Sequence, residues 1–203
     1  MPPGKASLLL LALPATAFDS GHPMTTPDDI LRFWFEETPE AAWWKVDPAF
    51  DDRLRARYQA LLVQAAAGEL QAWRSTAHGR LAEVLVLDQF PRNIHRGTPL
   101  AFAHDPMALV LSQEAVRCGA LAELTPVQRS FLLLPYMHSE SRAIHALAEL
   151  LYREHAPASN LEFELRHKAI IDRFGRYPHR NAILGRASTP EELDFLQQPG
   201  SAF

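Results

Sequence analysis

The chain has 203 residues, of which 47% are hydrophobic and 22% charged, so it is long enough to bury the core of an ordinary globular domain. Its net charge of −4 argues against a surface that coats nucleic acid, and a single cysteine excludes an internal disulfide framework and a zinc cluster built on cysteines. There are 30 alanines and 29 leucines but only 21 Val, Ile and Thr residues, which favours helix over sheet.

Residues 1–23 differ from the rest of the chain. Ala6–Phe18 is apolar and follows Lys5, as in a secretory signal peptide, but it is too short to span a bilayer. The alternative is that translation starts at Met24 and that residues 1–23 are an upstream extension. This alternative is favoured because Lys5 is the only basic residue before the apolar stretch. We therefore expect one domain over 24–203 and a cytoplasmic protein, or an exported one if residues 1–23 are a signal peptide.

Six prolines directly follow a residue whose side chain can cap a helix. This order marks helix starts, because proline in the first turn loses no hydrogen bond. The six pairs are Thr26-Pro27, Asp47-Pro48, Thr98-Pro99, Asp105-Pro106, Thr125-Pro126 and Thr189-Pro190. With the apolar periodicity they predict helices over 27–37, 48–67, 79–89, 106–118, 126–134, 136–154, 160–174 and 190–197.

The predicted helices indicate an all-α fold of antiparallel helical hairpins. The helix at 79–89 is apolar nearly all round, so we expect it at the centre of the bundle, and we expect Pro91 to end it. Short loops favour neighbouring helices that pack side by side. No stretch rich in Gly or Ser divides the chain.

The first polar segment that packing alone does not explain is Asp88–Asn93. A carboxylate at the end of so apolar a helix needs a partner. Asp88 is therefore a candidate acid or base, and the candidate ligand-binding residues beside it are Gln89, Arg92 and Asn93. The alternative is a capping and turn segment in which Asp88 pairs with an arginine for structure.

The second polar segment is 173–181. Gly175 and Pro178 break the helix there, so its basic side chains are able to converge, and arginine forks fit the oxygens of carboxylates and phosphates. The alternative is that the arginines neutralise core acids such as Asp88 and Asp172. The candidate ligand-binding residues are Arg173, Arg176, Arg180 and Asn181, with His179 as a candidate proton carrier.

Further candidates come from the predicted helix 136–154 and from the helix after it. His138 and Glu140 are candidate acid–base residues; the alternatives are a solvated polar stripe for His138 and His145, and a structural ion pair for Glu140. His167 shares a helical stripe with apolar residues, so it is either a proton carrier or a hydrogen-bonded core residue. Metal binding through some of His138, Glu140, His145 and His167 is an open alternative, but their spacing is not diagnostic, so no metal site is assigned.

Five segments in this order resemble a bacterial family of unknown function, number 924 among such domains. They are 30–35 (ILRFWF), 87–93 (LDQFPRN), 138–140 (HSE), 173–186 (RFGRYPHRNAILGR) and 188–192 (STPEE). The resemblance covers about residues 27–203 and implies a fold similar to tetratricopeptide-type helical hairpins, with a family start near Met24. It implies no reaction and no catalytic residues.

Two hypotheses about function follow. The first is a pocket for a small anionic ligand, a phosphate or carboxylate compound, with a hydrolase-type reaction as its enzymatic form. It predicts that six residues surround one cavity: Asp88, Arg92, Glu140, His167, Arg176 and Arg180. The second is a helical scaffold that binds a peptide or protein partner. Neither involves nucleic acid or a membrane, and the sequence assigns no cofactor and no oligomeric state.

Overall fold

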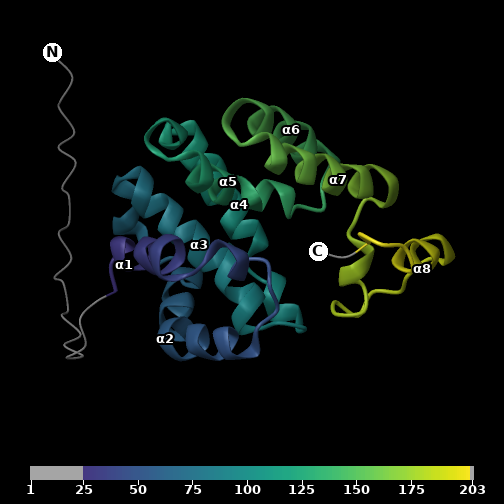
Figure 1. Ribbon diagram of the computed structural model, residues 1–203, viewed down its shortest axis with the longest axis horizontal. Helices are drawn as coiled ribbons and strands as arrows, with labels where there is room; N and C mark the ends of the chain where they lie inside the picture. The colour runs from purple at the N-terminus through teal and green to yellow at the C-terminus, as the bar shows by residue number, and fades with distance from the viewer. Residues whose placement is uncertain (1–24, 202–203) are drawn as a thin grey trace, which may run out of the picture.

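The computed structural model describes residues 25–201, which form eight α-helices linked by short 3₁₀ and π turns, with no strand in that range (Figure 1). The all-α prediction is confirmed. The expectations for residues 1–23 lie outside the described residues. The helices are α1 (Pro27–Arg32), α2 (Pro48–Ala66), α3 (Ala77–Ile94), α4 (Asp105–Arg117), α5 (Pro126–Met137), α6 (Arg142–His155), α7 (Ala158–Phe174) and α8 (Pro190–Leu196).

Four of the six predicted caps are present. The side chains of Thr26, Asp47, Thr125 and Thr189 accept hydrogen bonds from the first turns of α1, α2, α5 and α8, each with proline in the first turn. Thr98 caps no helix through its side chain. Asp105 is the first residue of α4 rather than its cap, so its carboxylate is available for other contacts.

Each helix from α2 to α6 packs on the next one along the chain, and α3 lies at the centre, in contact with α1, α2, α4 and α5. Leu81, Leu85 and Phe90 on α3 have no exposed surface, which confirms the predicted central position. The segment after α7 turns through η6 (Pro178–Arg180) to α8, and Tyr177 and Phe195 of this segment form a smaller apolar cluster with the end of α7. A tetratricopeptide-like arrangement stays a prediction.

Two helices continue through a buried proline. We expected Pro91 to end its helix, but α3 runs on to Ile94; similarly, α5 runs through Pro135 to Met137. An interior proline costs about 3 kcal/mol because a hydrogen bond is lost and its ring meets the preceding turn. Here burial of the surrounding helix offsets that cost. The predicted helix 136–154 therefore begins only at Arg142, and residues 138–141 form a turn between α5 and α6.

Candidate functional site

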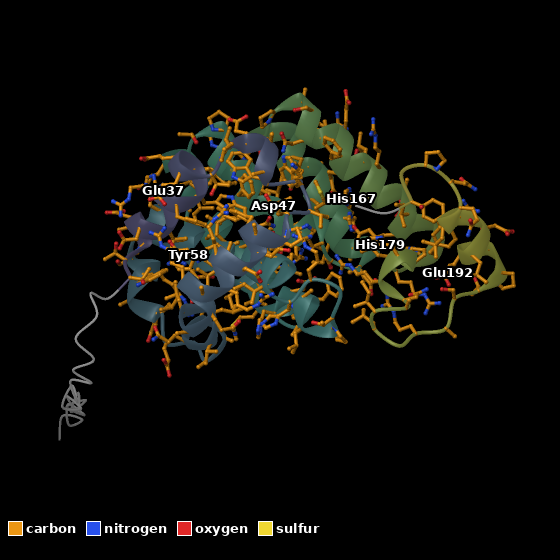
Figure 2. All side chains as sticks on the ribbon, turned by 60° about the horizontal axis from the view of Figure 1, so that its bottom comes forward. Glu37, Asp47, Tyr58, His167, His179 and Glu192 are labelled. Atoms are coloured by element: carbon orange, nitrogen blue, oxygen red, sulfur yellow. The ribbon has the colours of Figure 1, made fainter. Side chains whose placement is uncertain are left out.

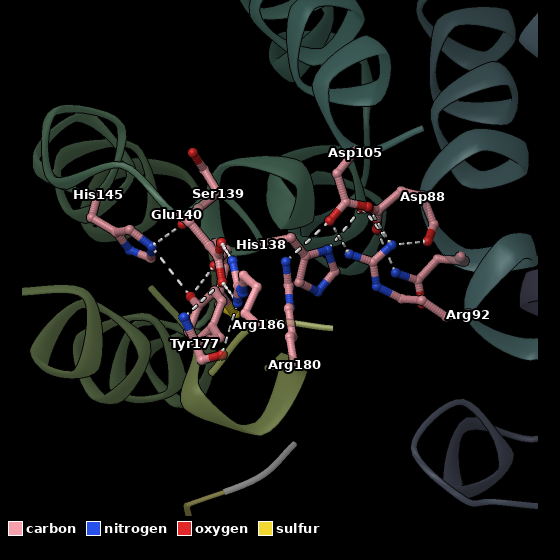
Figure 3. A network of polar contacts seen from close by, with 12 residues as sticks. Asp88, Arg92, Asp105, His138, Ser139, Glu140, His145, Tyr177, Arg180 and Arg186 are labelled. Atoms are coloured by element: carbon pink, nitrogen blue, oxygen red, sulfur yellow. Dashed lines mark hydrogen bonds and ion pairs between the residues drawn. The ribbon is translucent and has the colours of Figure 1, made fainter. Parts of the chain in front are cut away.

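Asp88 and His138 form a hydrogen-bonded pair at the junction of α3 and α5 (Figure 3). His138 Nδ1 lies 2.8 Å from Asp88 Oδ1, and Gln89 Nε2 donates to Asp88 Oδ2 over 2.6 Å. Burial alone raises the pKa of Asp88, but the charge of Arg92 and the hydrogen bonds of His138 and Gln89 hold that pKa below its ordinary value. Asp88 is thus an ionised carboxylate inside the protein.

The proton on His138 can be placed from this contact. Burial, together with the charge of Arg92, lowers the pKa of His138, so its imidazole is neutral at neutral pH. An ionised carboxylate only accepts, so Nδ1 carries the proton and Nε2 keeps a lone pair. The side chain of His138 is 15% exposed. A carboxylate that orients a neutral imidazole is the arrangement of a general base.

Asp105 joins two arginines that are far apart in the sequence. Arg92 Nη1 and Nη2 lie 2.9 and 3.1 Å from the two oxygens of Asp105, and Arg180 Nη1 lies 3.3 Å from Oδ2. Arg92 Nη1 is also 3.3 Å from Asp88 Oδ1. We call Asp88, Arg92, Asp105, His138 and Arg180 the polar cluster; α3, α4, the 138–141 turn and η6 all contribute to it.

Arg180 is the least satisfied member of the polar cluster. Its guanidinium carbon lies 4.6 Å from the ring centres of both Phe102 and Tyr177, and the residue is 6% exposed. Its Nε is buried, with no hydrogen-bond acceptor among residues 25–201. Burial and the charge of Arg92 lower the pKa of Arg180, although a guanidinium keeps its proton in proteins. The cluster therefore holds a buried cation with a donor that no described residue uses.

Glu140 is engaged outside the polar cluster. Arg186 binds both of its oxygens, with Nη2 2.8 Å from Oε1, and the main-chain N–H of Tyr177 donates to Oε1 over 2.7 Å. Burial raises the pKa of Glu140, but these contacts hold it below its ordinary value. Glu140 thus forms the structural ion pair that is the alternative to an acid–base role. This ion pair connects the 138–141 turn to the segment after α7.

Three residues expected at an anion site contact other groups. Arg176 donates to Glu192 over 2.7 and 2.8 Å, and Asn181 donates to the same carboxylate over 3.3 Å. Arg173 is exposed and pairs with Glu191 at 2.8 Å. Figure 2 shows Glu192 at the α8 end of the molecule, on the far side of His179 from Tyr58. Asp88, Arg92 and Arg180 thus meet in the polar cluster, whereas Arg176 is bound by Glu192. That the six residues surround one cavity stays a prediction.

Asn93, His167 and His179 are the remaining candidate site residues. Asn93 donates to the main-chain oxygen of Gln89, 3.0 Å away on the previous turn. His167 donates from Nδ1 to the oxygen of Phe163 over 2.7 Å, and burial lowers its pKa to about 3. Burial and the charge of Arg180 lower the pKa of His179 to about 4. Both histidine rings lie beside Tyr177 and are neutral at neutral pH.

Several residues that shape this site are not predicted from the sequence. In the sequence Asp105 has the position of a helix cap, and Arg186 does not stand out from its arginine-rich segment. The alternative of a solvated stripe is wrong for His145, which is fully buried in the first turns of α6, a helix that begins six residues later than predicted. The signal that points to Asp105 and Arg186 is the count of charges. The segment 173–186, which includes Arg186, has arginines but no Asp or Glu, so its acidic partners, such as Asp105, lie elsewhere in the chain.

Neither of two open clefts in the structure contains a predicted site residue. One, of about 180 Å³, is lined by Trp43, Trp44 and Phe131; the other, of about 440 Å³, is lined by Phe33, Phe50 and Arg57 among others. Over residues 25–201, no three His, Cys, Asp or Glu side chains are grouped closely enough to hold a metal ion. In the same range, no helix combines the length and apolar character that crossing a membrane requires.

The fold defines an all-helical domain over the residues that the structure describes. The chain belongs to the family described as "Bacterial protein of unknown function (DUF924)", whose model matches residues 30–200, and this confirms the resemblance seen in the sequence. It is similar to the solved structure of a protein of unknown function, ATU0120, from Agrobacterium tumefaciens. The two are 38% identical with a TM-score of 0.80, over 84% of this chain and 96% of that one. A search of curated proteins gave no match.

Proposed function

We propose that the polar cluster binds a small anionic molecule through a phosphate or carboxylate group. The observation that carries the proposal is Arg180, a buried cation held by one 3.3 Å contact to Asp105 and with a buried Nε that meets no acceptor among residues 25–201. A buried donor without a partner costs about 1–3 kcal/mol. An anion oxygen on the Nε edge recovers that free energy.

The rings beside Arg180 limit how an anion approaches. Phe102 and Tyr177 lie 4.6 Å from the guanidinium carbon, so they occupy the surroundings of its faces and leave its edge for hydrogen bonding. Nη1 is directed to Asp105, which leaves the edge formed by Nε and Nη2. This edge matches two oxygens of one carboxylate or phosphate.

His138 gives the same cluster a group able to move a proton. With Nδ1 donating to Asp88, Nε2 can take a proton from water while the water oxygen bonds to the phosphorus of a bound phosphate ester. The bond from phosphorus to the leaving oxygen breaks, and that oxygen takes the proton from the imidazolium, which restores neutral His138. The products are an alcohol and inorganic phosphate, so we propose a hydrolase-type reaction as the enzymatic form.

Thermal unfolding with and without inorganic phosphate tests the binding. At a hundredfold excess over its dissociation constant, phosphate should stabilise the protein by about 2.7 kcal/mol. Arg180→Ala should lose this stabilisation with its helical circular dichroism intact, and Arg180→Lys should lose most of it, since lysine keeps the charge without the fork. Arg173→Ala removes an exposed arginine paired with Glu191 and serves as the matched control.

Hydrolysis of p-nitrophenyl phosphate tests the role of His138. We expect His138→Gln to lower the rate about a hundredfold or more while stabilisation by phosphate persists. If no anion shifts the melting temperature and Arg180→Ala unfolds the chain, the polar cluster is structural. That result supports the alternative function, a scaffold for a peptide or protein partner.

A further inference from the structure

A second pair of titratable side chains lies entirely inside the protein, behind the turn that carries His138. His145 on α6 and Glu164 on α7 are both fully buried, and His145 Nδ1 lies 2.7 Å from Glu164 Oε1. His145 Nε2 lies 2.9 Å from the main-chain oxygen of Ser139 (Figure 3). One imidazole therefore connects α7 to the 138–141 turn.

The protons of this pair follow from its partners. The oxygen of Ser139 only accepts, so Nε2 of His145 carries a proton. One further proton lies between Nδ1 and Glu164, on either side, and the pair is neutral in both cases. Burial raises the pKa of Glu164, and its Oε2 meets no hydrogen-bond partner among residues 25–201, so His145 is the contact that holds the carboxyl. The N–H of His145 toward Ser139 is thereby fixed in direction.

The main-chain carbonyls on both sides of His138 are held by side chains. Ser139 O accepts from His145, and Met137 O accepts from the hydroxyl of Tyr177, which also lies 3.2 Å from His145 Nε2. A buried ionisable pair adds little stability over an apolar pair of similar volume. The specific effect of the His145–Glu164 pair is to hold the backbone geometry at His138.

We infer that His145 and Glu164 are positioning residues that set the orientation of His138 toward Asp88. The inference rests on the proposed function in that it takes His138 as the proton-accepting group. Groups behind a reactive imidazole must hold it within a fraction of an ångström of its productive place, and hydrogen bonds to its backbone do this without touching a ligand. His145 and Glu164 both lie outside the polar cluster.

The test is the titration of the His138 ring, followed by NMR in the full chain without any anion and identified by its absence in His138→Gln. Glu164→Met keeps the volume but loses the hydrogen bond. We expect the pKa of His138 to move by at least about half a unit toward the ordinary value near 6.5. Glu164→Gln can still donate to Nδ1 of His145, so it should keep the titration of the wild type and its rate of p-nitrophenyl phosphate hydrolysis.

Glu83→Met is the matched control, because Glu83 is an equally buried carboxylate bound by Arg74 over 2.6 and 2.7 Å and makes no contact with the 138–141 turn. It should lower stability without moving the His138 titration. An unchanged titration in folded Glu164→Met overturns the inference. If that variant does not fold, His145→Phe is measured in the same way, and failure of both to fold also overturns it, since the pair then supports the whole fold. A lack of phosphate binding by the wild type contradicts only the proposed function.

Discussion

Arg92 holds Asp105 with both of its terminal nitrogens, at 2.9 and 3.1 Å, and this fork is the contact that an anionic ligand of the cluster would itself make. Arg180 reaches the same carboxylate at 3.3 Å. Asp105 is therefore an internal anion shared by two arginines. A bound phosphate either displaces it or joins it at the unused edge of Arg180, and in both cases the charge of Asp105 opposes binding.

Asp105→Asn removes that charge while keeping the shape of the side chain. We expect it to bind inorganic phosphate about tenfold more tightly, which corresponds to about 1.4 kcal/mol. It should also lower stability without phosphate by about 1–3 kcal/mol, because charged hydrogen bonds to the arginines are lost. Calorimetric titration measures the first effect and urea unfolding the second.

Asp172→Asn is the control for Asp105→Asn, because it removes a carboxylate that pairs with Lys168 at 2.6 Å outside the polar cluster. Its phosphate affinity should equal that of the wild type. Weaker phosphate binding by Asp105→Asn would contradict the competition and show that Asp105 instead holds the arginines in place for the ligand.

Arg176→Ala should affect stability but not anion binding. Glu192 is 2% exposed and accepts from Arg176, from Asn181 and from the main-chain N–H of Thr189. Removing Arg176 takes two charged hydrogen bonds from this carboxylate, so the urea midpoint should fall by more than it does in Arg173→Ala, where both partners are exposed. Stabilisation by phosphate should be that of the wild type. Its loss would return Arg176 to the anion site.

The sequence predicts helix starts well and helix ends less well. Thr26, Asp47, Thr125 and Thr189 cap their helices as expected, because a cap and its proline act within one turn. Whether Pro91 or Pro135 ends a helix depends instead on what the surrounding helix buries. That burial arises from packing against other helices, and no local pattern shows it.

The candidate site was predicted by residue but not by pairing. Asp88 and His138 are 50 positions apart, and which arginine meets which carboxylate depends on how α4, η6 and the 138–141 turn pack around α3. The sequence therefore identifies Asp88, His138 and Arg180, but it misses Asp105, whose place before a proline has a simpler local explanation. It also does not show that Arg176 pairs with Glu192 outside the polar cluster.

A side chain at Gly79 should destabilise the fold. A Cβ at this position in the first turn of α3 would lie 1.9 Å from the main-chain oxygen of Trp73, so the preceding 3₁₀ turn would have to move. We expect Gly79→Ala to lower the free energy of unfolding by about 1–3 kcal/mol in urea titrations. Gly68, with φ of +77° and open space around it, is the control: Gly68→Ala should cost about 1 kcal/mol from backbone strain alone. A smaller effect at Gly79 than at Gly68 would contradict the clash.

His167 should make the protein sensitive to mild acid. Its pKa is about 3 in the folded chain, lowered by burial, against about 6.5 when unfolded. Above pH 6.5 the full stability is present. As the pH falls below 6.5, the unfolded state binds a proton that the folded state does not, so stability decreases progressively down to about pH 3. At pH 5 this loss amounts to about 2 kcal/mol for one such histidine.

His167→Gln does not titrate and can still donate to the oxygen of Phe163. The difference in unfolding free energy between pH 7 and pH 5, measured with urea, should therefore be smaller than in the wild type by about that amount. Equal differences in the two proteins would mean that His167 takes up its proton without leaving the folded state.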